Sequence, residues 1–347
     1  MITPELLGGL LFPLTALPGI AGHEDAVARA MAAHLGPLAD AVQVDALGNV
    51  TARFGPETGG PRLAVLAHMD TVGFLVKQVR PDGMLGIVAV GGVNARALPG
   101  AEVRVGDLPG VIGVRAQHLA GSVEPAEDPE GLTIQVDPGL AAGIEVTTPV
   151  TYAPRAVELG GGLVCSPYLD NRAGCAVLLA LAGALAAEPP PCPVYLIGTV
   201  QEETTCSGAY HALRAAAPDV AIFVDGTLSY DTPETQHLGT VRLGDGPVLT
   251  SFLYTRGLNG WHAHPVLRAH LKAVAAAEGI AVQQDAVRGL ISDARVAVWL
   301  GLPSALIGLP MRGKHAPLET AHLDDLVAAA RLLAATVRRP LPDLSRG

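Results

Sequence analysis

Histidine and carboxylate side chains follow four short apolar runs in this chain of 347 residues. The runs cover residues 63–67, 194–200, 221–224 and 304–309, and the side chains that come after them are His68, Asp70, Glu202, Glu203, Asp225 and His315. Such runs are typical of strands buried on both faces of a parallel sheet, whose carboxyl ends meet at one edge. A further carboxylate, Asp170, comes just before a predicted helix, whose N-terminus favours negative charge. We therefore expect these side chains to converge on one site.

Two histidines and several carboxylates, with no cysteine among them, form a donor set for borderline to hard metal ions. Zinc, cobalt and manganese all accept imidazole and carboxylate ligands. The set is large enough for two ions, and one carboxylate can bridge ions that lie about 3.5–4 Å apart. A carboxylate left over beside the ligands is suited to act as a general base, which takes a proton from water and passes it to a leaving group.

Each of these residues also has an ordinary structural explanation. Glu202 and Glu203 can form a solvated surface pair, and Asp225 precedes a glycine, as aspartates do in many turns. Asp170 can cap the following helix, and His315 can make a local hydrogen bond in a loop. These separate explanations leave the shared placement at strand ends unexplained, so we favour a metal centre.

Strands that alternate with helices make up most of the chain outside residues 71–163. Helices are predicted at residues 24–35, 172–187, 208–216, 264–278 and 321–337, after a first helix that contains Leu10, Leu11 and Leu14. Besides the four apolar runs, strands are predicted in a hairpin at residues 42–54 and at residues 248–254 and 282–285. This alternation predicts an α/β fold, with a mostly parallel sheet covered by helices on both faces.

Residues 71–163 have a different character. This stretch is rich in Gly and Pro, has short alternating runs at residues 73–79 and 85–90, and shows little helical periodicity. Short strands with frequent turns predict a small β-barrel or sandwich. The expected organisation is a discontinuous catalytic domain, residues 1–70 and 164–347, interrupted by a small β-barrel domain at residues 71–163.

The composition excludes several classes of protein. Hydrophobic residues make up 49% of the chain, enough for a large core, so a disordered chain is excluded. The net charge of −10 and the lack of a basic run argue against nucleic acid or an anionic membrane as a partner. The longest apolar run, residues 173–187, is shorter than the ~20 residues that a membrane span needs. Four cysteines without a C-x-x-C pair fit a reducing compartment, so we expect a cytoplasmic protein.

Six short motifs occur in order along nearly the whole chain. They are LAHMDTVGF at residues 66–74, LDNR at 169–172, GTVQEE at 198–203, FVD at 223–225, DTP at 231–233 and KHAPLE at 314–319. Together they resemble the motifs of the tetrahedral (TET) aminopeptidases, dinuclear metallopeptidases that include glutamyl, leucyl and lysyl aminopeptidases. The resemblance implies a zinc-exopeptidase-like catalytic domain that is interrupted by a small β-domain.

The resemblance also implies roles for individual residues. One metal ion would be held by His68, Asp170 and Asp225, and a second by Asp170, Glu203 and His315, with Asp170 bridging the two. Glu202 would be the general base, and Asp70 would fix the ring of His68. The implied cofactors are two divalent ions per subunit, zinc first, with cobalt and manganese as alternatives. Family members form dimers that build twelve-subunit particles and act on short peptides.

The chain departs from the usual family pattern in three places. Asn171 stands where the family commonly has a second aspartate. The turn at residues 204–208 (TTCSG) replaces a small turn that contains Val-Gly, and residues 290–294 (LISDA) replace a common Gly-Gly-Thr-Asp-Ala. All five ligand types are intact, so we expect activity, whereas the two altered turns leave the preferred N-terminal residue open.

The expected function is the metal-dependent removal of N-terminal residues from short peptides. One alternative is a related dinuclear amidohydrolase, a deacylase or a carboxypeptidase-like enzyme, because the same site handles any amide. Another is a non-catalytic metal-binding assembly protein. Hydrolysis by serine is disfavoured because no G-x-S-x-G motif occurs, and Cys206 lacks an evident activating base.

Overall fold

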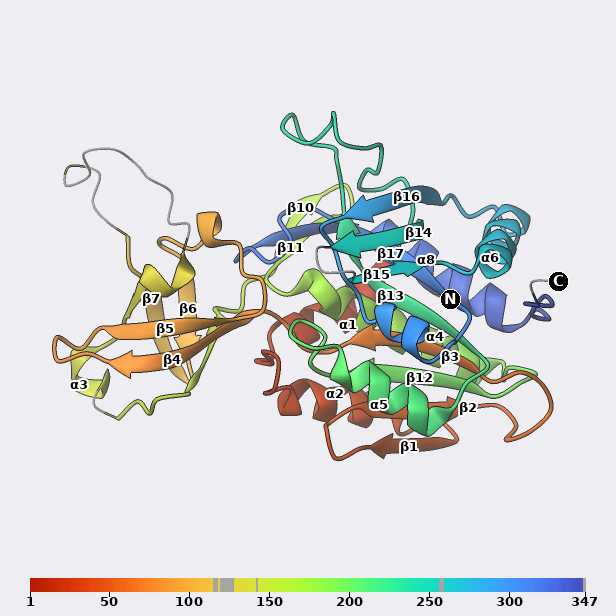
Figure 1. Ribbon diagram of the computed structural model, residues 1–347, viewed down its shortest axis with the longest axis horizontal. Coiled ribbons are helices and arrows are strands. Elements are labelled where there is room, and N and C mark those ends of the chain that lie inside the picture. The colour runs from red at the N-terminus through yellow and green to blue at the C-terminus, as the bar shows by residue number, and fades with distance from the viewer. Residues whose placement is uncertain (115–117, 119–127, 142, 256–258, 346–347) are drawn as a thin grey trace.

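The computed structural model describes residues 1–114, 118, 128–141, 143–255 and 259–345. The molecule is elongated, with a large α/β body and a smaller β-barrel at one end (Figure 1). Both chain termini lie on the α/β body (Figure 1). The chain therefore leaves the body to build the barrel and then returns to complete the body.

The centre of the body is a nine-stranded sheet. Its path is β1 (Ala41–Val44), β2 (Val50–Phe54), β12 (Val194–Thr199), β3 (Leu63–His68), β13 (Val220–Leu228), β17 (Ser304–Met311), β14 (Val248–Thr255) and β15 (Asn259–His262), with β16 (Gln283–Arg288) paired to β14. The four central strands β12, β3, β13 and β17 are parallel to one another. Their carboxyl ends therefore share one edge, as the positions of the polar residues predict.

Helices cover both faces of this sheet. On one face lie α1 (Pro4–Thr15), α2 (Asp25–Leu35), α4 (Leu169–Ala187), α6 (Pro265–Ala277) and α8 (Leu323–Val337), and on the other α5 (Ser207–Ala216) and α7 (Arg295–Trp299). Along β3, Val65 and Ala67 pack into the first layer, whereas Ala64 and Leu66 pack into the second. Burial on both faces explains why this strand is an unbroken apolar run.

Helix α4 runs through the core of the body. Among the described residues it is the one helix long and apolar enough to cross a membrane, and 83% of its most apolar window is buried inside the protein. Its first turn carries Arg172, which is fully buried and donates to the backbone oxygens of Leu14 at 2.7 Å and Leu17 at 3.3 Å. These bonds join α4 to the end of α1, and the burial identifies α4 as a core helix.

The smaller part is a closed antiparallel barrel. Its strands are, in order around the barrel, β4 (Gly73–Val79), β5 (Leu85–Val90), β8 (Thr133–Gln135), β7 (Leu108–Ile112), β6 (Glu102–Val105) and β9 (Pro149–Tyr152). Phe74, Ile87 and Ile134 lie in its apolar core. The predicted fold class, a mostly parallel α/β sheet interrupted by a small β-barrel, is confirmed, whereas the domain boundaries at residues 70/71 and 163/164 stay a prediction.

A third sheet lies next to the site edge. It consists of β10 (Val157–Gly160), β11 (Leu163–Ser166) and β18 (Glu319–His322), and the short helices α3 (Pro138–Ala141), η1 (Ala95–Ala97) and η3 (Pro129–Gly131) complete the described elements. Ser166 pairs with Glu319, so the segment before α4 lies beside the segment after His315. The predicted helix at residues 321–337 begins too early, because residues 319–322 pair with β11 and the ring of His322 caps α8.

Candidate metal centre

His68 is the last residue of β3, and its side chain is 3% exposed. Its Nε2 lies 3.4 Å from Asp225 Oδ1, 3.5 Å from Asp170 Oδ1 and 3.9 Å from Glu202 Oε2. Its Nδ1 lies 3.1 Å from the backbone oxygen of Asp70 and 3.5 Å from Oδ1 of the same residue. One ring nitrogen thus faces three carboxylates, while Asp70 contacts the other.

The carboxylate of Asp70 is fully buried and holds the turn that follows β12. Its Oδ1 accepts the backbone N–H of Glu202 and its Oδ2 accepts that of Glu203, both at 2.9 Å. Glu24 accepts the backbone N–H of Gln201 at 3.0 Å. Because buried carboxylates accept the backbone N–H groups of this turn, the two glutamates that follow Gln201 have fixed positions beside His68.

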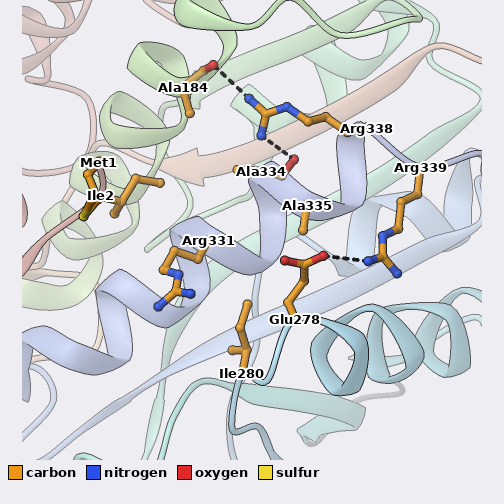
Figure 2. A pocket seen from close by; sticks show the side chains of 10 residues that line it. All are labelled: Met1, Ile2, Ala184, Glu278, Ile280, Arg331, Ala334, Ala335, Arg338 and Arg339. Carbon is orange, nitrogen blue, oxygen red and sulfur yellow. Dashed lines mark hydrogen bonds and ion pairs between the residues drawn. The ribbon is translucent and has the colours of Figure 1, made fainter.

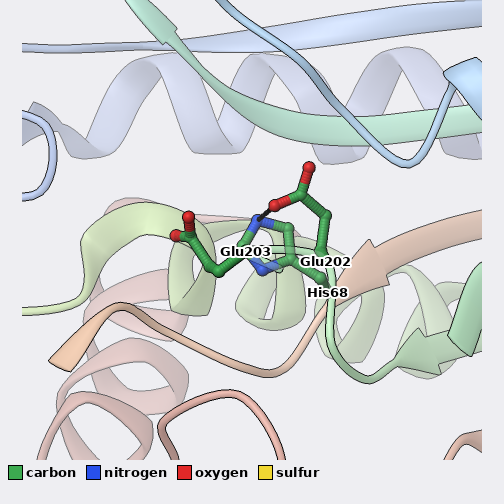
Figure 3. Close-up of side chains that lie close together, drawn as sticks. All are labelled: His68, Glu202 and Glu203. Atoms are coloured by element: carbon green, nitrogen blue, oxygen red, sulfur yellow. Dashed lines mark ion pairs between the residues drawn. The ribbon is translucent and has the colours of Figure 1, made fainter. Parts of the chain in front are cut away.

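Glu202 and Glu203 are both buried, with side chains 8% and 5% exposed. The explanation that they form a solvated surface pair is therefore wrong. Figure 3 shows the two side chains on opposite sides of the His68 ring, with the Glu202 carboxylate reaching its Nε2. Two adjacent residues thus present carboxylates to different parts of the same site.

Asp170 and Asp225 reach the site from neighbouring elements. Asp170 is at the start of α4, where the φ and ψ angles of Asp170 and Asn171 are not helical. Asp225 lies inside β13, which continues to Leu228, so the strand predicted to end at residue 224 is longer and Asp225 is not a turn residue. A Cβ atom on Gly226 would lie 2.9 Å from Asp170 Oδ1, so only a glycine lets this carboxylate approach β13.

His315 faces the other oxygen of Asp170. Its Nε2 lies 3.3 Å from Asp170 Oδ2 and 3.3 Å from Glu203 Oε1. Its Nδ1 lies 2.6 Å from the backbone oxygen of Gly92, in the segment that follows β5. The side chain is 25% exposed, so this part of the site lies closer to solvent than His68 does. The structure therefore brings together all seven residues that the sequence predicts for the site.

The carboxylates create a field that favours positive charge. Burial alone lowers the pKa of His68, but the charges of Glu202 and Asp170 outweigh it and raise that pKa well above its usual value. For His315, burial again lowers the pKa, and Asp170 and Glu203 raise it to about 11. A buried group of carboxylates is unfavourable unless cations balance it, so the site is suited to bind cations.

The donor atoms have the spacing of metal ligands. Three groups have ligand atoms within 4.8 Å of one another, namely His68–Asp170–Asp225, Asp170–Glu203–His315 and His68–Glu202–Glu203. The distances of 3.3–3.5 Å between imidazole and carboxylate match the ~3.4 Å edge of a tetrahedron whose centre lies about 2.1 Å from each donor, a typical zinc–ligand distance. Within the described chain, Asp170 Oδ1 and Glu203 Oε1 are buried without a hydrogen-bond partner. The residues therefore fit divalent ions.

A hollow of about 210 Å³ opens beside these donors. Its wall includes Thr204 and Cys206 from one altered turn, Leu290 and Ile291 from the other, and Arg295 from α7. Both turns that depart from the family pattern therefore line the space next to the predicted ligands. A substrate side chain in this hollow would contact them.

A larger hollow, of about 590 Å³, lies between α8 and the N-terminus (Figure 2). Two of its arginines are already engaged, because Arg339 pairs with Glu278 at 2.6 Å and Arg338 donates to the backbone oxygen of Ala184 at 3.0 Å. Its wall contains no histidine and no cysteine. The chemistry of the described chain is therefore concentrated at the smaller hollow.

Two further charged residues at the site, Glu319 and Lys314, are not predicted from the sequence. Glu319 accepts the backbone N–H of Asp170 at 2.8 Å and that of His315 at 2.6 Å, and burial raises its pKa to about 8. Lys314 places its Nζ 2.7 Å from Asp170 Oδ2 and donates to the backbone oxygen of Gly226 at 2.8 Å. Both residues belong to the KHAPLE motif, which was the available signal, but a motif does not tell which way a loop side chain points.

The surroundings of Cys206 and Asn171 explain why neither residue needs a catalytic role. Cys206 is buried, burial raises its pKa, and its Sγ lies 3.6 Å from the backbone oxygen of Glu202, so it is not an activated nucleophile. Asn171 donates from Nδ2 to the backbone oxygen of Val224 at 2.8 Å and accepts the N–H of Gly174 at 3.0 Å. The amide at position 171 thus uses both a donor and an acceptor, which an ionised aspartate cannot do.

Comparison with known proteins gives consistent matches over nearly the full length. A family profile described as M42 glutamyl aminopeptidase matches residues 48–332. The lysyl aminopeptidase of Pyrococcus furiosus is 30% identical over 344 residues, which cover 94% of this chain and 95% of that protein. The solved structure of aminopeptidase APDkam598 from the archaeon Desulfurococcus kamchatkensis is 30% identical, covers 98% of this chain and 97% of its own, and has a TM-score of 0.91. That of the Pyrococcus horikoshii TET1 peptidase, described as able to assemble into a tetrahedron or a large octahedral shell, is 27% identical over 95% and 98% of the two chains, with a TM-score of 0.82.

Proposed function

The chain belongs to the family of M42 glutamyl aminopeptidases, and from this premise we propose that it removes the N-terminal residue of short peptides with two divalent metal ions. Family membership makes it a hydrolase that acts on peptides. The observation that carries the two-ion proposal is the position of Asp170, whose Oδ1 faces His68 and whose Oδ2 faces His315. A carboxylate between two imidazoles is suited to bridge two ions.

We propose that each ion has three protein ligands. His68, Asp170 and Asp225 would hold one ion, and Asp170, Glu203 and His315 would hold the other. Zinc is our first choice, and cobalt or manganese suit the same nitrogen and oxygen donors. Divalent ions at such a centre supply Lewis acidity, which lowers the pKa of water and polarises a carbonyl.

In the proposed mechanism Glu202 carries the proton. It is outside the two ligand sets, its Oε2 lies 3.9 Å from His68 Nε2, and it lines the hollow. It accepts a proton from the attacking water as the water oxygen bonds to the peptide carbonyl carbon, and it returns the proton to the amine nitrogen when the C–N bond breaks. Asp70 positions both His68 and Glu202, because it contacts the His68 ring and accepts the backbone N–H of Glu202.

The proposed substrates are short peptides, because the hollow measures only about 210 Å³ and is partly enclosed by the two altered turns.

We also propose a homo-oligomer, from a dimer to a twelve-subunit particle, since the Pyrococcus horikoshii relative is described as forming a tetrahedron. A cytoplasmic location is proposed because all four cysteines are free, as in a reducing compartment. Nucleic acids and membranes are not among the proposed partners.

Hydrolysis of paired substrates tests the proposal. Metal-stripped protein is assayed with a panel of dipeptides and aminoacyl anilides, each beside its N-acetylated form, before and after Zn²⁺, Co²⁺ or Mn²⁺ is added. We expect the metal to restore cleavage of the free-amine forms only. Cleavage of the acetylated forms would move the assignment to a deacylase-type amidohydrolase. Metal binding without cleavage of any substrate in the panel would contradict the catalytic proposal.

A further inference from the structure

Lys314 is a buried cation inside the candidate metal centre. Its side chain is 10% exposed, and its Nζ lies 2.7 Å from Asp170 Oδ2. The same ammonium donates to the backbone oxygen of Gly226 at 2.8 Å, so its position is fixed from two sides. The proposed hydrolysis gives this residue no role.

The oxygen that Lys314 contacts belongs to one of the two proposed ion sites. Asp170 Oδ2 lies 3.3 Å from His315 Nε2, whereas Oδ1 of the same carboxylate lies 3.5 Å from His68 Nε2. The ammonium therefore stands on the His315 side of the shared carboxylate. It engages the oxygen that an ion at His315 needs and leaves free the oxygen that an ion at His68 needs.

The ammonium of Lys314 places positive charge beside only one of the two proposed ion positions. It lies 2.7 Å from Asp170 Oδ2, the oxygen that His315 Nε2 faces at 3.3 Å, whereas the carboxylates of Asp70 and Glu202 lie beside His68. An ion at His315 would therefore have a like charge next to it. Like charges a few ångströms apart repel strongly in a buried site, because the effective dielectric constant there is low.

We propose that Lys314 weakens the site formed by Asp170, Glu203 and His315, so that the two ions bind with unequal affinity. This inference rests on the proposed two-ion function. The first ion binds at His68, and the second binds at His315 only when free metal is more abundant. The protein therefore holds one ion at limiting metal and two at high metal.

A metal titration tests the inference without reference to catalysis. Metal-stripped full-length protein is dialysed against stepped concentrations of free Zn²⁺, and bound zinc per chain is measured by mass spectrometry. For the wild type we expect two binding steps whose dissociation constants differ by at least about tenfold. In Lys314→Met and in Lys314→Gln we expect the second step to tighten by about tenfold or more, with the first unchanged within about threefold.

Two controls locate the effect. Lys272→Met removes an exposed lysine of α6 and should leave both steps as in the wild type. His315→Ala should bind one ion, and adding Lys314→Met to it should not change the affinity for that ion. If Lys314→Met does not fold, Lys314→Gln decides, because its amide still donates to Gly226.

The outcomes separate the inference from the proposed function. If both Lys314 variants bind the second ion with wild-type affinity, or if Lys314→Met also tightens binding in the His315→Ala background, the inference is wrong while the two-ion function stands. If wild type and variants all bind at most one ion even at millimolar metal, the two-ion function itself is wrong.

Discussion

At the scale of single residues, the loss of Glu202 should separate catalysis from metal binding at the candidate metal centre. Glu202→Gln keeps the size of the side chain and the backbone N–H that Asp70 accepts, but it removes the proposed proton acceptor. We expect kcat on a free-amine dipeptide to fall by about 100-fold or more, with metal content unchanged. Turnover near the wild-type rate would mean that another group is the base.

His68 should behave in the opposite way. Its Nε2 faces the carboxylates of Asp170 and Asp225, which are the other two proposed ligands of the first ion. His68→Ala therefore removes one of three proposed ligands. We expect one ion fewer per chain after dialysis, because two remaining carboxylates bind a borderline ion weakly. Metal content is measured beside His23→Ala, an exposed histidine. Equal metal content in both variants would contradict the proposed ligand.

The predicted site residues that the structure brings together share a physical reason. His68 ends one buried parallel strand and Glu203 comes shortly after another, and polar groups in such positions have few roles other than a site at the sheet edge. Lys314 and Glu319 lie instead in and beside a loop with a left-handed residue, His315, at φ 64°. No periodicity applies there, so neither the contact of Lys314 with Asp170 nor that of Glu319 with His315 follows from spacing.

At the scale of elements, the junction between α1 and α4 depends on Arg172. Its guanidinium donates to the backbone oxygens of Leu14 and Leu17 from a fully buried position. Arg172→Lys keeps the charge but loses the planar fork, which leaves at least one buried carbonyl unpaired. We expect a loss of about 1–3 kcal/mol and a lower Tm. Arg331→Lys, exposed on α8, is the matched control and should melt like the wild type.

The start of α8 gives a prediction about pH. Asp325 is buried and accepts the N–H groups of Gly244 and Gly246, both at 2.8 Å. Burial raises its pKa to about 6, above the ordinary 3.8 of an aspartate. The folded state therefore holds this proton more tightly than the unfolded state does. Its contribution to stability is present below about pH 4 and is lost as the pH rises through 6, by at most about 3 kcal/mol.

Thermal unfolding of Asp325→Asn from pH 4.5 to 7 tests this contribution. The Tm of the variant minus that of the wild type should become more positive as the pH rises, since the amide has no proton to lose. The neighbouring charged groups, His322 and Asp245, are the same in both proteins. Asp107→Asn, at an exposed position between β6 and β7, should show a constant difference. A flat profile for Asp325→Asn would show that its pKa is not raised.

Elements buried on both faces are the easiest to predict. The runs that became β3, β12 and β17 are unbroken because helices cover both faces of the sheet. The strand β13 extends past Asp225 because its polar end is still paired with β17, which a hydrophobic pattern does not reveal. Residues 319–322 alternate between buried and half-buried, but the buried Glu319 is polar. They also pair with β11 from far away in the sequence, so a hydrophobic pattern favours a longer α8.

At the scale of the whole molecule, the change in composition after residue 70 correctly predicts a separate β-structure, and the closed barrel explains it. The barrel's own short strands need only local alternation to be recognised. Its contact with the metal centre is a different matter. That contact passes partly through backbone atoms of Gly92 and Asn94, for which the side chains in the sequence give no signal.

The barrel and the α/β body meet at His315. Gly92 lies 2.6 Å from its Nδ1, Asn94 donates its N–H to the His315 backbone oxygen at 3.1 Å, and the hydroxyl of Tyr152 donates to the same oxygen at 3.3 Å. All three come from the segment that builds the barrel. One proposed ligand of the second ion is thus positioned by the smaller part of the molecule.

Tyr152→Phe tests this coupling, because it removes the hydroxyl and keeps the ring that stacks on Tyr168. We expect weaker binding of the second ion by about tenfold or less, consistent with a single neutral hydrogen bond, and no change for the ion at His68. We therefore expect Tyr152→Phe to lose more activity at limiting Zn²⁺ than at excess Zn²⁺. Tyr195→Phe, in β12, is the control and should leave both binding steps unchanged. Weaker binding of both ions in Tyr152→Phe would indicate general loosening of the fold, and unchanged binding would mean that the barrel does not position His315.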